Sequence, residues 1–306
     1  MSRNTQITMS NLTKNFGRVK ALNDFTINIE SGIFGLVGPN GAGKTTILRI
    51  LLGLIRPDKG SACVLGINVS KGSEKYLNQV GVLHENPYYP PSLTPTEYLN
   101  TIASLYRKSR STEELLSLVD LSDAANRKIK NLSAGMYRRL GIAQTLVGRP
   151  RLVFLDEPTS NLDVRGRDLI VQLIIKTHQE EGVSFFLTSH ILSELERACH
   201  EIGFINEGRL IDKGQLKELV EKHTQNRFRI ISSDATKLKG ILEKETEIVK
   251  LLIEGSATLI IEVSTSFAKN IDTRLRELVV DSDINLYEIR NTGTLEDAFR
   301  KVMDFE

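Results

Sequence analysis

The segment Gly38-Pro39-Asn40-Gly41-Ala42-Gly43-Lys44-Thr45-Thr46 decides the fold. It fits the phosphate-binding loop pattern, in which a glycine-rich turn ends in lysine and a hydroxyl residue. A continuously apolar run, Ile33 to Val37, precedes it and is typical of a buried strand. Helical periodicity follows from Thr45 to Leu54. Strand, loop and helix stand in the order that the pattern requires, which predicts an α/β P-loop NTPase core. An ordinary glycine-rich turn is the alternative.

The residue types of this loop suit a nucleoside triphosphate. Glycines let backbone N–H groups converge on phosphate oxygens, and the start of the following helix adds its positive end. Lys44 is expected to reach the β- and γ-phosphates, and the Thr45 hydroxyl to join a Mg²⁺ shell. No Asn-Lys-x-Asp motif for reading guanine occurs in the chain, so ATP with Mg²⁺ is favoured over GTP. The residues expected to hold the nucleotide here are Gly38, Pro39, Asn40, Gly41, Ala42, Gly43, Lys44, Thr45 and Thr46.

A second apolar run, Leu152 to Leu155, ends in two adjacent carboxylates, Asp156 and Glu157. Buried charge is unfavourable without partners, so this ending is unusual for a purely structural strand. Neighbouring side chains on a strand point to opposite faces, and the two carboxylates can therefore take different tasks. We expect Asp156 to hold Mg²⁺, usually through water, and Glu157 to orient and polarise an attacking water. The alternative is a pair of solvated acids at a strand end.

A third buried strand, Val183 to Leu187, leads through a short polar turn to His190. A lone histidine is usually incidental, but open α/β sheets place their sites at the ends of core strands. We therefore assign His190 a catalytic role beside Glu157. The other four histidines lack such a setting.

The remaining patterns predict how the chain is organised. Strands that alternate with helices imply a parallel sheet with helices on its faces. These elements form a predicted domain of residues 1–222. Apolar alternation at residues 7–12 and 25–29 predicts an antiparallel β-subdomain. Helix start signals predict an inserted helical subdomain at about residues 86–148, and a helix at residues 215–222 is predicted to close the domain. After a polar linker, residues 227–306 are predicted to form a small C-terminal α+β domain, because two βαβ-like halves suggest a ferredoxin-like unit.

Composition limits the partners. The 306 residues include 40 basic and 38 acidic side chains, which leaves +2 and no electrostatic footprint for nucleic acid. Cys63 and Cys199 are too few for a disulfide framework or a zinc site and suggest reduced thiols of a cytosolic protein. The first ten residues lack the apolar core of a signal peptide, and no apolar run reaches the ~20 residues needed to cross a bilayer.

At the level of whole motifs, the chain resembles the ATP-binding subunits of ABC transporters over about residues 5–220. Leu132-Ser133-Ala134-Gly135-Met136 is similar to the ABC signature and is followed by a helix. The phosphate-binding loop, this signature, the aspartate–glutamate strand, Ser160-Asn161-Leu162-Asp163 as the D-loop and His190 as the switch histidine occur in the order of that family.

This resemblance implies a mechanism that needs two chains. Two such domains are expected to pack head to tail with two ATP molecules between them, so a second ATP-binding subunit, most simply an identical one, is required. Ser133 and the N–H groups near Gly135 would grip the γ-phosphate bound on the opposite subunit, and Asp163 belongs to the same interface. The resemblance also places Phe16 against adenine. Read from the residue alone, Phe16 is more typical of a core aromatic.

Two departures from the family pattern affect the expected chemistry. Glu85 stands where glutamine is usual; it can still reach Mg²⁺ or water, but it cannot donate a hydrogen bond when ionised. The signature has Ala134 and Met136 where glycine and glutamine are commoner. Ser133 and Gly135 remain, so we expect hydrolysis to be slower or altered at most.

The resemblance implies an ATPase motor on the cytoplasmic face of the cell membrane, with separate transmembrane permease subunits. Asn86-Pro87-Tyr88-Tyr89, the later Leu93-Thr94 and the domain after residue 226 resemble the branch that exports drugs, antibiotics or polymers. A soluble ABC ATPase acting on the ribosome or on DNA is the alternative; it would usually carry two ATPase domains or long coiled coils. A regulatory module without turnover is disfavoured by Glu157 and His190.

Overall fold

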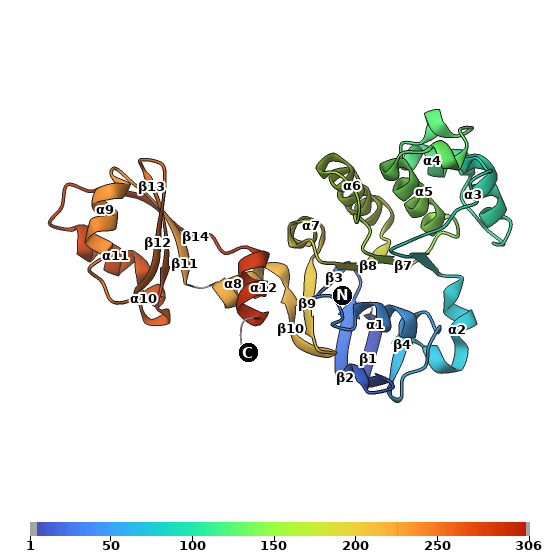
Figure 1. Cartoon of the computed structure of the whole chain (residues 1–306), viewed down its shortest axis with the longest axis horizontal. Helices are drawn as coiled ribbons and strands as arrows, with labels where there is room; N and C mark the ends of the chain where they lie inside the picture. Colours follow the sequence, from blue (N-terminus) through green and yellow to red (C-terminus); the bar gives the residue numbers. More distant parts are fainter. Residues whose placement is uncertain (1–4, 225, 304–306) are drawn as a thin grey trace. The chain divides into compact units, whose positions relative to one another are not determined.

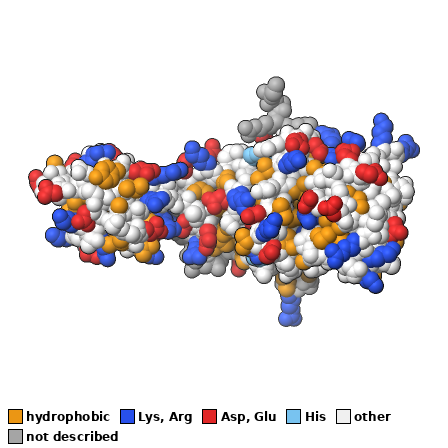
Figure 2. Space-filling model, turned by 90° about the horizontal axis from the view of Figure 1, so that it is seen from above, with side chains coloured by type: hydrophobic (Ala, Val, Ile, Leu, Met, Phe, Trp, Pro, Cys, Tyr) orange, Lys and Arg blue, Asp and Glu red, His pale blue; other side chains and the backbone are white. Residues whose placement is uncertain are grey.

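The computed structural model describes residues 5–224 and 226–303. The chain divides into two compact units, and the boundary falls between Gln215 and Leu216. Figure 1 shows the elements in chain order. On the face shown in Figure 2, basic and acidic side chains are interspersed, in line with the balanced composition. Within the described residues no helix is both long and apolar enough to cross a membrane.

A six-stranded sheet lies at the centre of the first unit. Its order is β10 (Arg209–Gln215), β9 (Glu201–Asn206), β3 (Ile33–Val37), β8 (Ser184–Ser189), β7 (Leu152–Asp156) and β6 (Val80–Leu83). The strands from β9 to β6 run parallel, and β10 is added antiparallel at the edge through a hairpin with β9. Every residue of β3, β7 and β8 is buried, as expected for a parallel sheet covered on both faces. The three buried strands predicted from the sequence are confirmed.

Strand register brings the functional loops to one edge of this sheet. Val37 lies opposite Ser189, and Asp156 lies opposite Thr188, so β3, β7 and β8 end together. These strands lead into α1 (Lys44–Leu51), α6 (Val164–Glu181) and α7 (Leu192–Ala198). Open α/β sheets carry their sites at this carboxyl edge.

A four-stranded antiparallel sheet completes the core of the first unit. Its order is β2 (Val19–Glu30), β1 (Thr5–Phe16), β4 (Lys59–Val64) and β5 (Ile67–Asn68), with α2 (Val69–Leu77) following. Alternate residues of β1 and β2 are buried, and their apolar side chains share one core with α1 and the central sheet. The antiparallel strands predicted from apolar alternation are confirmed, and each is longer than its pattern indicated.

The chain between β6 and β7 is helical, as predicted. It contains α3 (Pro95–Ala103), α4 (Thr112–Leu118) and α5 (Ala134–Leu146), with 3₁₀ turns at Ser122–Ala124 and Ile129–Asn131. Thr94 and Ser111 cap α3 and α4: Thr94 forms a capping box with Glu97, and Ser111 accepts from the Glu114 N–H group. Both predicted helix starts are therefore confirmed. The cap residues accept hydrogen bonds from free N–H groups of the first turn, which is the interaction on which the prediction rested.

The second unit contains a four-stranded antiparallel sheet of order β12 (Ile248–Glu254), β13 (Thr258–Val263), β11 (Arg227–Ser232) and β14 (Leu286–Asn291). The helices α9 (Ala235–Leu242), α10 (Thr265–Lys269) and α11 (Ile271–Val279) contribute to its apolar core. The strand that begins the unit is central and pairs with the third and fourth. This is the ferredoxin-like order predicted from the two βαβ-like halves.

One helix lies in a different unit from the one predicted. The sequence indicated that a helix at residues 215–222 closes the first domain. In the structure this helix, α8 (Leu216–Thr224), packs against α12 (Leu295–Met303) and belongs to the second unit. The prediction failed because α12, which packs against this helix, begins about 80 residues further along the chain. Apolar periodicity within a short window does not show which distant element a helix packs against.

Candidate active site

The loop between β3 and α1 has a backbone that admits only small residues at two points. A Cβ atom at Gly38 would lie 2.2 Å from the carbonyl oxygen of Ile205. Gly43 has φ of 109°, and a Cβ atom there would lie 2.6 Å from the carbonyl oxygen of Ala21. Gly43 is also the N-cap of α1, without any side-chain hydrogen bond to the helix. The first N–H groups of α1 are therefore left for an anion.

Lys44 is buried at the base of this loop. Its Nζ atom donates to the carbonyl oxygens of the first two loop residues, at 2.6 and 3.1 Å. Burial lowers the pKa of the Lys44 ammonium, and the nearby carboxylates of Glu157, Asp156 and Glu85 oppose that shift. The three carboxylates therefore favour a positive charge at the centre of the loop.

Asp156 and Glu157 both depend on Thr188 of the adjacent strand β8. The Thr188 hydroxyl donates to Asp156 Oδ1 at 2.6 Å, and the Glu157 N–H group donates to the Thr188 carbonyl oxygen at 3.0 Å. One carboxylate oxygen of Asp156 is thus held in place, which leaves the other for a further partner. The strand pairing that sets the fold also sets the direction of the two acids.

Glu157 and His190 form the closest functional pair. Glu157 Oε2 lies 2.8 Å from His190 Nδ1 and 3.3 Å from the His190 backbone nitrogen. A carboxylate oxygen accepts, so Nδ1 is the donor when the Glu157 carboxylate takes part in this contact. Glu157 itself has φ of 47°, in the left-handed region that non-glycine residues rarely adopt. Such backbone strain is commonly held at functional sites.

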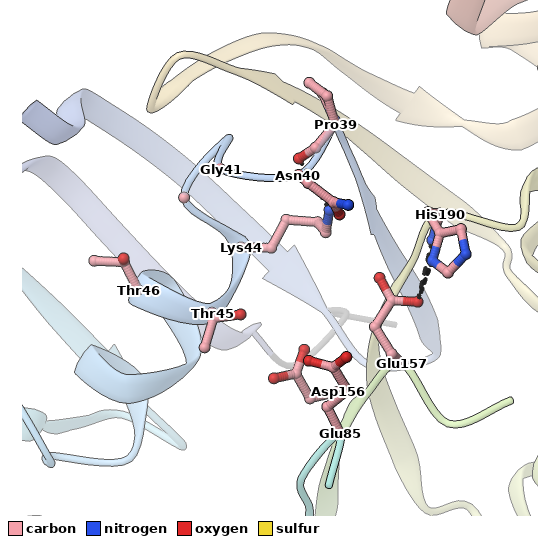
Figure 3. A pocket seen from close by; sticks show the side chains of 11 residues that line it. Pro39, Asn40, Gly41, Lys44, Thr45, Thr46, Glu85, Asp156, Glu157 and His190 are labelled. Carbon is pink, nitrogen blue, oxygen red and sulfur yellow. Dashed lines mark hydrogen bonds and ion pairs between the residues drawn. The ribbon is translucent and has the colours of Figure 1, made fainter. Parts of the chain in front are cut away.

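These elements enclose one pocket of about 250 Å³ (Figure 3). It is lined by Pro39, Asn40, Gly41, Gly43, Lys44, Thr45, Thr46, Glu85, Asp156, Glu157 and His190. Segments from the ends of four strands (β3, β6, β7 and β8) therefore meet here. Gly38 and Ala42 do not line the pocket; both pack inward, and Ala42 is buried.

The oxygen donors of the pocket fit a magnesium ion. Thr45, Glu85 and Asp156 present a hydroxyl and two carboxylates to the same cavity. Within residues 5–224 and 226–303 no group of three His, Cys, Asp or Glu side chains is close enough to hold a metal ion by itself. Mg²⁺ commonly uses one or two carboxylates and takes its other ligands from water and phosphate, so the donor set suits it.

Besides Gly38 and Ala42, four predicted site residues lie outside this pocket. Ser133 is the N-cap of α5, where its Oγ atom accepts from the Met136 N–H group at 3.3 Å. Asp163 caps α6 by accepting from the Gly166 N–H group at 2.7 Å. A Cβ atom at Gly135 would meet no atom within 4 Å, so the packing of this chain does not require glycine there.

Phe16 is the fourth of these residues, and it is not a core aromatic. Its side chain is 47% exposed at the end of β1, with Lys14 Nζ 5.6 Å from the ring centroid. The interpretation drawn from the residue alone is therefore wrong. The alternation of β1 ends before Phe16, and the last two residues of the strand are exposed.

Sequence reasoning missed two residues that shape the site. Thr188 belongs to the short polar segment before His190; its hydroxyl holds the Asp156 carboxylate, and its carbonyl oxygen accepts from the Glu157 N–H group. Arg138 of α5 is 5% exposed and donates hydrogen bonds to the backbone carbonyls of Glu85 and Glu157, the former at 2.7 Å. Burial lowers the pKa of the Arg138 guanidinium, and nearby acidic groups oppose that shift. No local motif signals an arginine whose partners lie in two other segments of the chain.

The segment after Glu157 is anchored from the opposite side by α7. The Thr159 hydroxyl donates to Glu194 Oε2, and Arg167 Nε lies 3.8 Å from Glu194 Oε1. Glu194 is buried, and this burial raises the pKa of its carboxyl group, while the Thr159 hydroxyl opposes the shift. The chain from Glu157 onward is thus held between α5 and α7.

The chain is similar to known ATP-binding proteins. The family described as ABC transporter matches residues 22–160. The bacitracin transport ATP-binding protein BcrA of Bacillus licheniformis is 33% identical over 303 residues, which are 98% of this chain and 97% of that protein. An uncharacterized ABC transporter ATP-binding protein of Bacillus subtilis, YcbN, is 31% identical over 306 residues and 98% of each chain.

Solved structures show the same likeness for part of the chain. An ATP-binding subunit of an ABC transporter aligns with a TM-score of 0.63 and 26% identity, covering 71% of this chain and 92% of that one. A bacterial cassette, dimeric in a post-hydrolysis state bound to ADP and Pi, aligns with a TM-score of 0.62 and 25% identity, covering 69% and 98%.

Proposed function

Because this chain belongs to the ABC transporter family, we propose that it is the ATPase subunit that drives an exporter whose membrane-spanning part is formed by separate chains. The observation that carries this proposal is the match to the bacitracin transport ATP-binding protein along 98% of the chain. That match extends through the second unit. A lantibiotic transport ATP-binding protein of Streptococcus pyogenes is also 38% identical over 205 residues. We therefore propose antimicrobial peptides as the exported class, and the cytoplasmic face of the membrane as the place of work.

The pocket supports hydrolysis by direct attack of water on the γ-phosphate. The N–H groups at the start of α1 and the Lys44 ammonium would hold the phosphates. Glu157 would take a proton as the water oxygen bonds to phosphorus and the bond to the β-phosphate oxygen breaks. His190 would keep the carboxylate aimed through its Nδ1 contact. Mg²⁺, held by Thr45, Asp156 and Glu85, would neutralise charge on the β- and γ-phosphates.

A second copy of the chain would complete each site. Ser133 is exposed, caps α5 and lies outside this chain's own pocket, so it and the N–H groups near Gly135 would offer an anion-binding helix start to a second copy. The absence of any steric need for glycine at Gly135 supports close approach of a ligand from outside. Asp163 lies in the same proposed interface. A head-to-tail homodimer is the simplest arrangement, because one surface then serves both sites.

Replacing Phe16 by alanine should weaken ATP binding by about 5- to 100-fold, the range of ~1–3 kcal/mol for the loss of one base–aromatic stack. Phe16→Tyr should bind as tightly as the wild type, because stacking uses only the face of the ring. Equilibrium titration with a fluorescent ATP analogue measures both. Equal affinity of the wild type and Phe16→Ala would remove Phe16 from the adenine site.

Export is tested by identifying the chains that accompany this one in its native membranes. A tagged Glu157→Gln variant, expected to bind ATP without turnover, is recovered from detergent-solubilised membranes with ATP and Mg²⁺. The same variant carrying Lys44→Ala serves as the matched control. A stoichiometric chain with several membrane spans supports the proposal. Recovery of ribosomes or DNA-repair proteins without a membrane chain would contradict it and assign the ATPase to the soluble class.

A further inference from the structure

The side chain of Arg138 joins α5 to two segments that carry the proposed catalytic groups, one after β6 and one after β7. It projects from the second turn of α5, and its guanidinium is enclosed by the protein. Its Nε atom donates to the Pro158 carbonyl oxygen at 2.6 Å. The Nη1 atom donates to the carbonyl oxygens of His84 at 3.2 Å and Glu85 at 2.7 Å. One residue therefore spans the ends of β6 and β7.

The Nη2 atom completes this set of contacts. It donates to the carbonyl oxygens of Glu157 and, at 3.4 Å, of Asp156. It also lies 3.2 Å from Ser160 Oγ. The five N–H groups of the guanidinium thus serve six acceptors, and no other type of side chain carries five donors in a fixed plane.

The contact with the Glu157 carbonyl bears on the strained backbone of that residue. Glu157 has φ of 47°. Its N–H group donates to Thr188, and its carbonyl oxygen accepts from Arg138 and, at 3.2 Å, from the Ser160 N–H group. A non-glycine residue stays in this region only when its surroundings fix it. Loss of the Arg138 bond would leave the Ser160 turn as the remaining contact of this carbonyl, and we expect the backbone to relax and the carboxylate to shift away from His190.

The neighbouring residue on α5 grips the other end of the segment that contains Glu85. The Tyr137 hydroxyl donates to the Pro87 carbonyl oxygen at 3.1 Å and accepts from the Tyr89 N–H group at 3.0 Å. The rings of Tyr137 and Tyr89 also pack together, with centroids 4.5 Å apart. The start of α5 therefore holds residues 84–89 through their backbone, independently of the side chain of Glu85.

We propose that Arg138 is a positioning residue for ATP hydrolysis, which fixes the backbone of Glu85 and Glu157 to the first turns of α5. The Glu157 carboxylate is then in place for attack only when α5 is in place. Because α5 begins at Ser133 and Gly135, contact of a second copy's nucleotide with that helix start is transmitted to the catalytic carboxylate of this chain. The last step rests on the proposed dimer; the positioning itself rests only on the ATPase activity.

The test replaces Arg138 by lysine in the full-length chain. Lysine keeps the charge but presents its donors from a single atom and cannot serve the segments after β6 and β7 together. We expect kcat to fall by about 10- to 100-fold, the size of effect that a 1 Å misplacement produces, while KM for ATP and the affinity for a fluorescent ATP analogue stay within about two-fold. The phosphate-binding loop does not touch Arg138, so binding is spared.

The matched control is Arg139→Lys, the next residue along α5. Arg139 bonds to the carbonyl oxygens of Val119 and Asp120 within the helical segment. Among the described residues it makes no hydrogen bond to the segments after β6 and β7 that Arg138 holds. Its kcat should stay within about two-fold of the wild type.

Each outcome decides the proposal. A wild-type kcat for Arg138→Lys, or an equal loss for Arg139→Lys, overturns it, and so does a loss of nucleotide affinity as large as the loss of kcat. An Arg138→Lys protein that does not fold, judged by its thermal unfolding midpoint, would assign the residue to stability and also overturn it. If the wild-type protein itself hydrolyses no ATP, the proposed function fails first. If the wild type is active and Glu157→Gln is not, only the role of Arg138 is at issue.

Discussion

Glu157→Gln should lower kcat for ATP hydrolysis by about 10²- to 10⁴-fold, the usual contribution of a positioned general base. The amide has nearly the shape of the carboxylate, but it cannot take the proton from the attacking water. Glu157 lies at the end of β7, 2.8 Å from His190 Nδ1, and it makes no hydrogen bond to the phosphate-binding loop within the described residues. Nucleotide binding should therefore be retained, which phosphate release and equilibrium titration measure separately.

A glutamate outside the pocket provides the control for this variant. Glu180 is exposed near the end of α6, and Glu180→Gln makes the same chemical change away from the pocket. It should hydrolyse ATP at the wild-type rate. Rapid hydrolysis by Glu157→Gln would show that Glu157 is not the general base. Glu85, whose carboxylate lines the same pocket, would then be the next candidate for that role.

Lys44→Ala acts on binding itself. The ammonium is buried among the loop carbonyls and lies near three carboxylates, so its removal leaves those carboxylates without their nearest cation. A hydrogen bond to a charged group contributes about 1.5–3 kcal/mol, and the loss of one such bond raises the dissociation constant for ATP by about 10- to 150-fold. Calorimetric titration of ATP in the presence of Mg²⁺ measures this change.

Lys176→Ala is the matched change on an exposed position of α6, and it should leave ATP affinity unaltered. The Lys44→Ala protein should also unfold at a temperature no lower than the wild type in the absence of nucleotide, because a buried cation among carbonyls stabilises little after desolvation. Unchanged affinity in a folded Lys44→Ala protein would contradict the assignment of this loop to phosphate.

The central fold and the pocket could be predicted because their signals are local. The phosphate-binding loop, the acidic strand end and His190 each follow a run of buried residues, and parallel strands bring such ends to one edge. The expectation of a parallel sheet was therefore enough to predict that Lys44, Glu157 and His190 lie close together. The residue types at these positions then indicated their chemistry.

Features that depend on distant partners could not be predicted in the same way. Arg138 looks like any helix arginine, and its role arises from carbonyls about 20 and 50 residues away in the chain. The placement of α8 depends on α12, and the exposure of Phe16 depends on where β1 leaves the shared core. Each is decided by tertiary packing, which periodicity within a short window does not contain.

The order of the central sheet also has a consequence for how this protein is made. β3, which leads into the phosphate-binding loop, lies between β8 and β9, whose residues are 184–189 and 201–206. During synthesis neither edge of β3 can pair until about 150 further residues have been made, because its two neighbours in the sheet come later in the chain. Unpaired apolar edges invite aggregation, and such distant pairings close slowly. The nascent chain therefore carries an unpaired apolar strand through much of its synthesis, and the pocket at the ends of β3, β7 and β8 cannot form until β8 has been made.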